Sequence, residues 1–172
     1  MVTETQVVPD AGREVCCPLF KPENWDGIRH TWNEKPFLRK SIPQIFHIPL
    51  PGSYTRAITA MWKTASDAGV APKRDDFMLL AHDPSSFKSD LYMAVTGDIP
   101  GGKTVKLTGS FFSKVFEGKY SEVPKCLQKM NTFLASNQLV SIKDYIYYPY
   151  CPKCAGKYGH NYIVVFSQTE PL

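Results

Sequence analysis

Two stretches of the chain carry the same pattern: QIFHIPLPGSY at residues 44–54 and SFFSKVFEGKY at residues 110–120. Each is an apolar segment that ends in Gly-x-Tyr, and each is followed by an amphipathic segment and then by two short apolar segments. The order strand, helix, strand, strand is therefore predicted twice. Copies of such a unit that face one another would bind a ligand in the groove between them.

The helices follow from a 3.6-residue apolar repeat. The first is expected to begin at Ser53, a suitable N-cap, and to end at Gly69, a suitable C-terminal cap. The second is expected to begin near Ser121, with Pro124 in its first turn, and to end near Asn137. Strands rich in aromatic and aliphatic residues are predicted at 45–48, 77–81, 91–96, 110–116, 145–148 and 162–166. The predicted fold class is α+β: a duplicated βαββ unit that forms a curved antiparallel sheet with two main helices on one face.

Length and composition favour a compact globular protein. The chain has 172 residues, 43% hydrophobic and 13% aromatic, which is enough for a core without disulfides. The net charge of +4 is spread along the chain, so no nucleic-acid partner is expected. The sequence lacks both the roughly 20 apolar residues of a membrane helix and a secretory signal. We therefore expect no membrane partner and a cytoplasmic location.

The expected organisation has three parts. Residues 1–41 form an N-terminal tail and a proline-rich arm packed on the domain, with one strand near Ile28 to Trp32. Residues 42–168 form the domain, and residues 169–172 form a C-terminal tail. Trp25 and Trp32 support packing of the arm, because two tryptophans are costly to leave in water.

The duplicated order resembles the GyrI-like effector-binding domain, which forms the ligand-binding half of multidrug-responsive bacterial transcription activators. The resemblance covers residues 42–168 and is most specific in the second copy, at FEGKY 116–120 and YIYY 145–148. It implies a curved antiparallel sheet and a cleft that takes up aromatic, often cationic, drug-like molecules. Some stand-alone members of the family look like hydrolases of reactive electrophilic small molecules.

Two features depart from the family pattern. The activators carry an N-terminal helix-turn-helix, and the first 40 residues here are too rich in proline to form one, which implies stand-alone action. The strand that often carries a buried Glu beside its tyrosines has no carboxylate after Asp144 at its edge. Affinity for cations by that route is not expected.

The aromatic residues have two interpretations. Each one alone fits core packing, but several tyrosines on one strand indicate a cavity with a wet edge, because a buried hydroxyl needs a partner. The candidate ligand-binding residues are Tyr54, Trp62, Tyr92, Phe112, Tyr120, Tyr145, Tyr147 and Tyr162.

Glu117 and His47 are the titratable residues closest to the two Gly-x-Tyr corners. Glu117 is the candidate catalytic residue, acting as a general base on water while a tyrosine hydroxyl polarises the substrate. A surface role is the alternative. The sequence contains neither a Gly-x-Ser-x-Gly elbow nor a His-Glu-x-x-His helix. The predicted function is a stand-alone protein that binds a hydrophobic or aromatic small molecule between the repeats, and the alternative is a hydrolase that uses the same cleft.

The cysteines allow three interpretations. Cys16, Cys17, Cys151 and Cys154 could bind a structural zinc ion that ties the arm to the last hairpin, although no cofactor is required. They could instead be packed thiols. The third interpretation, a redox pair, needs a helix after Cys151, whereas AGKYG at 155–159 predicts a loop. Cys126 falls on the apolar stripe of the second helix and is expected to be a buried small hydrophobe.

Overall fold

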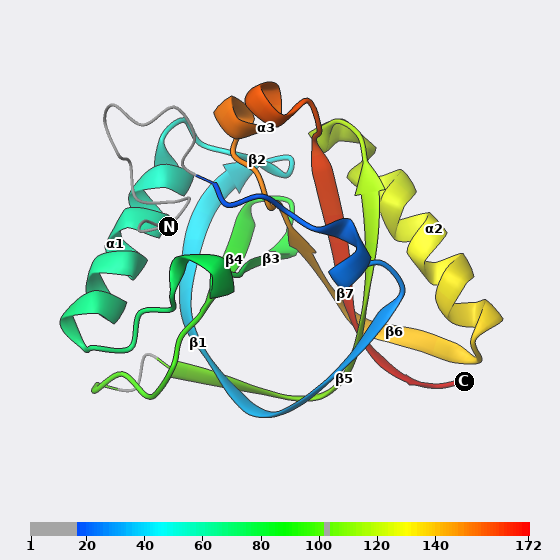
Figure 1. The fold of residues 1–172 in the computed structure, drawn as a ribbon, viewed down its shortest axis with the longest axis horizontal. Helices are drawn as coiled ribbons and strands as arrows, with labels where there is room; N and C mark the ends of the chain where they lie inside the picture. Colours follow the sequence, from blue (N-terminus) through cyan, green and yellow to red (C-terminus); the bar gives the residue numbers. More distant parts are fainter. Residues whose placement is uncertain (1–16, 102–103) are drawn as a thin grey trace. The chain divides into compact units, whose positions relative to one another are not determined.

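The computed structural model describes residues 17–101 and 104–172 (Figure 1). Residues 1–16, at the start of the expected N-terminal tail and including Cys16, lie outside this part of the chain. The described chain forms two compact units: unit 1 contains Cys17, Pro18 and Glu34–Leu107, and unit 2 contains Leu19–Asn33 and Thr108–Leu172. The strands are β1 (Ile28–Ile45), β2 (Ile48–Pro49), β3 (Leu79–Ser85), β4 (Lys88–Ala94), β5 (Thr104–Glu117), β6 (Leu139–Tyr147) and β7 (Tyr162–Pro171). The α-helices are α1 (Ser53–Asp67), α2 (Val123–Ser136) and α3 (Pro152–Tyr158).

In unit 1, β4 lies between β1 and β3 and pairs antiparallel with both strands. One face of these strands packs against α1, because the apolar residues of the helix recur every three or four positions. The core of unit 1 includes Leu38, Ile42, Ala57, Ile58, Met61, Ala65, Leu79, Leu91 and Met93.

In unit 2, β7 lies between β5 and β6 and is antiparallel to both. The apolar stripe of α2 packs on this sheet, and its core is formed by Phe112, Cys126, Met130, Leu134, Ile163 and Val165. The α+β class and the antiparallel pairing are therefore confirmed. In both units the last strand is central, but the origin of the units in a duplicated segment stays a prediction.

The expected strand at 45–48 is wrong. β1 ends at Ile45, and Phe46 and His47 form a two-residue turn with φ of 48° and 66°. The chain then returns as β2, with Ile45 opposite Ile48. His47 stabilises this turn because its ring contacts the Asp83 carboxylate at 2.9 Å and the Ser86 hydroxyl at 3.1 Å.

Two further boundaries differ from expectation. The strand near Ile28 to Trp32 continues to Ile45 despite Pro36 and Pro43. Pro43 lies opposite Lys88 of β4, two residues before β1 ends at Ile45. The N-cap of α1 is Gly52 rather than Ser53, because the chain enters the helix in the left-handed region, with φ of 72°. The Ser53 hydroxyl instead donates to the Leu50 carbonyl at 2.7 Å.

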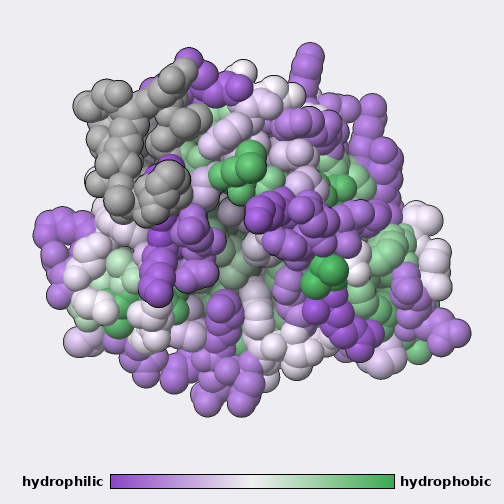
Figure 2. Space-filling view, viewed as in Figure 1, coloured by the Kyte–Doolittle hydropathy of each residue, from purple (hydrophilic) through white to green (hydrophobic). Residues whose placement is uncertain are grey.

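Neither unit contains, among its described residues, a helix long and apolar enough to cross a membrane. The face shown in Figure 2 is mainly hydrophilic, and hydrophobic residues appear on it as separate small areas.

Candidate functional site

Unit 2 holds a group of contacting aromatic rings, which we call the aromatic cluster. It arises from strand alternation: Ile146 and Tyr148 of the β6 segment face the α2 core, so Tyr145 and Tyr147 face the other way. The cluster consists of Phe20, Trp25, His30, Trp32, Phe111, Tyr147, Tyr150, Tyr162 and Phe166.

The cluster has a buried floor and a partly exposed upper layer. Phe111 and Phe166 are fully buried and stack with ring centroids 5.5 Å apart. Trp32 lies 4.6 Å from the Phe111 ring and 4.9 Å from the Phe166 ring, and His30 also lies 4.9 Å from Phe166. His30, Trp32, Trp25 and Phe20 are only partly buried. The layer therefore presents ring surface near the protein exterior.

Ser113 of β5 fixes two members of the upper layer. Its buried hydroxyl donates to the Trp25 carbonyl at 2.6 Å and lies 2.7 Å from Nε2 of His30. The single hydroxyl hydrogen is directed to Trp25, so Nε2 of His30 carries a hydrogen and donates. Burial lowers the pKa of His30. The imidazole is consequently favoured in its neutral form.

Glu117 lies at the end of β5, where the structure pairs it with His160. Nδ1 of His160 contacts Oε1 of Glu117, and both side chains are about half exposed, at 51% and 54%. The His160 ring stacks on Tyr162 with centroids 5.2 Å apart. Burial and, next, the Glu117 charge raise the pKa of Tyr162, so its hydroxyl keeps its proton at neutral pH.

The pair is connected to the aromatic cluster through one ring. Tyr162 lies 5.0 Å from Phe20, which in turn contacts Trp25 and Tyr147. When Nδ1 of His160 donates its hydrogen to the Glu117 carboxylate, Nε2 is the nitrogen of the neutral imidazole that can accept a proton. The arrangement thus places a base, a hydroxyl donor and aromatic surface within a few contacts of one another.

The predicted ligand-binding residues have different surroundings. Tyr147 and Tyr162 belong to the aromatic cluster, and Tyr145 lies on the same strand face with the Lys143 ammonium 5.2 Å from its ring. Phe112 packs in the α2 core, and Tyr120, 47% exposed, stacks on Tyr148.

The three candidates in unit 1 lie on α1 and β4. Tyr54 and Trp62 of α1 pack against the unit 1 core. Tyr92 of β4 is buried, with the Arg39 guanidinium 5.9 Å from its ring. The part of these residues in ligand binding, and the groove expected between the repeats, stay predictions.

Several residues of the site were missed from the sequence. Trp25 and Trp32 were recognised only as packing residues, and Phe20, His30, Phe166 and His160 were not selected. Alternation offered a signal, because His30 and Trp32 share one face of a strand. No sequence signal indicated the contact between His160 and Glu117, since 43 residues separate them along the chain.

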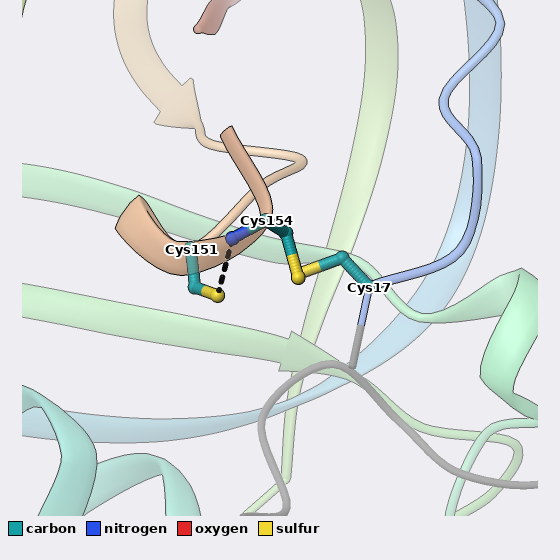
Figure 3. A group of neighbouring side chains, drawn as sticks. All are labelled: Cys17, Cys151 and Cys154. Atoms are coloured by element: carbon teal, nitrogen blue, oxygen red, sulfur yellow. Dashed lines mark hydrogen bonds between the residues drawn. The ribbon is translucent and has the colours of Figure 1, made fainter. Parts of the chain in front are cut away.

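The candidate metal-binding cysteines fall in different units: Cys17 belongs to unit 1, and Cys151 and Cys154 belong to unit 2. Figure 3 shows Cys151 and Cys154 of unit 2, at the start of α3. The backbone N–H of Cys154 donates to Sγ of Cys151 at 3.5 Å. None of the four cysteines in the described part of the chain forms a disulfide. Cys126 is buried against the sheet as expected, and burial raises its pKa.

The loop predicted at 155–159 is wrong, because the chain forms α3 from Pro152 to Tyr158. Pro152 suits the first helical turn, Cys151 is the N-cap, and Gly159 ends the helix with φ of 75°. The glycine at 156 is tolerated within this short helix. The absence of a helix after Cys151 is therefore no longer an argument against the redox interpretation of Cys151 and Cys154.

Comparisons with known proteins agree with the fold. A family model described as bacterial hydrolase matches residues 8–169. The crystal structure of the EcmrR C-terminal domain superposes with a TM-score of 0.58 at 12% identity, covering 86% of this chain and 99% of that chain. Among curated proteins no match was found. The GyrI-like fold expected from the sequence is confirmed.

Proposed function

The chain belongs to the bacterial hydrolase family, and we propose that it binds a small aromatic or hydrophobic molecule on the aromatic cluster of unit 2. The observation that carries this proposal is the layer of partly exposed rings, Phe20, Trp25, His30 and Trp32, above the buried Phe111 and Phe166. Rings already held in place lose little entropy when a flat ligand stacks on them.

The chemistry of the cluster favours an uncharged ligand. His30 is favoured in its neutral form, and no carboxylate follows Asp144 on the neighbouring strand segment. At His30 and Trp32 a cation would gain attraction from the ring faces, whereas the charges of Glu117 and Glu23 act at Tyr162. A neutral aromatic molecule gains stacking and apolar burial without desolvation of a charge.

Fluorescence titration of the full chain with the neutral probe N-phenyl-1-naphthylamine tests this proposal. Trp25→Leu removes a stacking surface and is expected to weaken binding by roughly tenfold, because an aromatic contact contributes about 1–1.5 kcal/mol. Phe87→Ala is the matched control, since Phe87 is an aromatic residue of unit 1 that is 59% exposed. Equal binding by the wild type and Trp25→Leu contradicts the proposal.

The pair of Glu117 and His160 favours a second function, ester or amide hydrolysis of the bound molecule. Glu117 orients His160, and Nε2 removes a proton from water as the resulting hydroxide adds to the carbonyl carbon. The Tyr162 hydroxyl donates to the oxyanion, and the leaving group departs with the proton from the imidazolium. His160 is then the base, and Glu117, the base proposed from sequence, becomes its positioning residue.

Hydrolysis of 1-naphthyl acetate tests this function. His160→Gln is expected to lower kcat/KM at least 100-fold, and Glu117→Gln less strongly. His47→Gln is a close control, because His47 pairs with Asp83 at 2.9 Å and is also 55% exposed. Hydrolysis at the buffer rate, or equal rates for the wild type and His160→Gln, rules out this function and leaves the binding proposal to its own test.

A further inference from the structure

Cys151 and Cys154 of unit 2 bring two sulfur atoms together at the first turn of α3. Cys151 is the N-cap, and Cys154 follows three residues later. Their Sγ atoms lie within 4.8 Å of each other, and the backbone N–H of Cys154 points at Sγ of Cys151 (Figure 3). A disulfide joins its sulfurs at about 2.05 Å. Rotation of the two side chains about their Cα–Cβ bonds covers the difference, so this pair can be oxidised without a change of fold.

The two thiols differ in exposure in the way that a stepwise exchange reaction requires. Cys151 is partly exposed, whereas Cys154 is 0% exposed. A molecule from solvent therefore reaches Cys151 first, and Cys154 lies behind it as the second thiol. Cys126 is a contrasting case, because it is buried in the α2 core and burial raises its pKa, which disfavours the reactive thiolate.

The sequence around the pair carries positive charge only. Residues 145–169 contain Lys153, Lys157 and His160 and neither Asp nor Glu. Both lysines belong to α3 and are exposed. A reactant that bears carboxylates is attracted to such a segment, because no acidic neighbour in it repels the reactant. The charge pattern thus favours an anionic disulfide as the partner of Cys151.

Aromatic contacts hold α3 at both of its ends. Tyr150 directly precedes Cys151, is buried, and stacks on Tyr158 at the end of α3 with ring centroids 4.6 Å apart. The Tyr150 hydroxyl also accepts from the Phe20 N–H at 2.9 Å. A fixed backbone keeps the two sulfurs close to one another, which favours the reaction between them over reaction of each with a separate molecule.

We propose that Cys151 and Cys154 form a redox-active dithiol that reduces low-molecular-weight disulfides bearing carboxylates. The Cys151 thiolate attacks one sulfur of the disulfide, which breaks its S–S bond, releases one thiolate and leaves a mixed disulfide on Cys151. The Cys154 thiolate then attacks Sγ of Cys151, which forms the protein disulfide and releases the second thiolate.

The reaction balances without a further reactant. Two electrons pass from the two cysteines to the external disulfide, and the two protons of the cysteine thiols end on the two released thiols. This activity is independent of ligand binding on the aromatic cluster and of hydrolysis, so its test leaves both of those proposals unaffected.

Incubation of the reduced full chain with oxidised glutathione tests the proposal. The wild type is expected to gain one disulfide and to lose two thiols that can be alkylated. Trypsin cleaves after Lys153, between the two cysteines, so the expected disulfide joins the tryptic peptides 144–153 and 154–157. Cys16 and Cys17 lie on a separate tryptic peptide, so mass spectrometry distinguishes their products from those of the pair.

Single variants separate the roles of the two thiols. Cys154→Ser is expected to accumulate one glutathione on Cys151, because the second step is blocked. Cys151→Ser is expected to leave Cys154 unmodified, because that thiol is buried. Cys126→Ala is the control and should form the same disulfide as the wild type. Circular dichroism identifies any variant that fails to fold, and Ala then replaces Ser at that position.

Three outcomes overturn the proposal. The first is a wild type in which peptides 144–153 and 154–157 stay unlinked and fully alkylated after incubation. The second is a disulfide that joins Cys151 or Cys154 to another cysteine instead. The third is a folded Cys151→Ser variant that takes up glutathione at Cys154 as fast as Cys154→Ser does at Cys151.

Discussion

Replacing Ser113 with alanine tests how the upper layer of the aromatic cluster is held. The wild-type hydroxyl donates to the Trp25 carbonyl at 2.6 Å and accepts from Nε2 of His30 at 2.7 Å, and the side chain is fully buried. Alanine removes both hydrogen bonds at once and adds no bulk. The carbonyl of Trp25 and the N–H of His30 then lose their partner.

The expected cost follows from these two bonds. Each neutral hydrogen bond contributes about 0.5–1.5 kcal/mol, and a buried group left without a partner costs about 1–3 kcal/mol. His30 and Trp25 are partly exposed, so water replaces some of the loss. We expect the free energy of unfolding to fall by about 2 kcal/mol, which corresponds to a decrease in Tm of about 4–8 °C.

Urea unfolding followed by far-ultraviolet circular dichroism measures this change. Ser136→Ala is the matched control, because the exposed Ser136 hydroxyl donates only within α2, to the Thr132 carbonyl at 3.0 Å. Its effect should stay within about 0.5 kcal/mol. If Ser113→Ala unfolds at the same urea concentration as this control, the two hydrogen bonds do not anchor the cluster and the reasoning is refuted.

Three further predictions concern stability. Burial of Asp90 opposes its ionisation. Hydrogen bonds from Ser41 and Arg39, together with nearby positive charges, outweigh this effect and lower the pKa of Asp90. The contribution of the Asp90 carboxylate to stability is complete above the pKa of the unfolded state and is lost as pH falls through the lower pKa of the folded state. In urea unfolding, Asp90→Asn should therefore cost about 2 kcal/mol at pH 7 and less at pH 2. Met130→Ala should cost about 2–5 kcal/mol in the same assay, because Met130 is fully buried in the α2 core, and an effect below 1 kcal/mol would contradict that packing. Gly159→Ala, at φ of 75°, should cost about 1–2 kcal/mol, and unchanged unfolding would show that α3 does not need this cap.

Elements with a strong local signal were predicted well. Apolar residues recur with the helical period in α1 and α2 and with the strand period in the β5, β6 and β7 segments. The type of each element therefore follows from neighbouring residues alone. The errors occur where several local conformations compete. Phe46 and His47 are aromatic and follow Ile45, yet they form a turn because β2 pairs back on β1 and His47 contacts Asp83.

The candidate site was predicted less completely than the fold. Glu117 and Tyr162 could be selected because they lie next to recognisable strands. Their relation to His160 depends on the pairing of β5 with β7, which places Glu117 opposite Tyr162. Such a contact is created by register, and register is a property of two strands rather than of either one.

The amino-acid sequence alone determined the α+β class, the two main helices and the GyrI-like resemblance, because periodicity and turn residues act over a few positions. Only the tertiary structure decided which side chains meet. It placed Trp25 and His30 on Ser113, and His160 on Glu117. Contacts between residues distant in the chain arise from packing and strand pairing, and no local pattern records them.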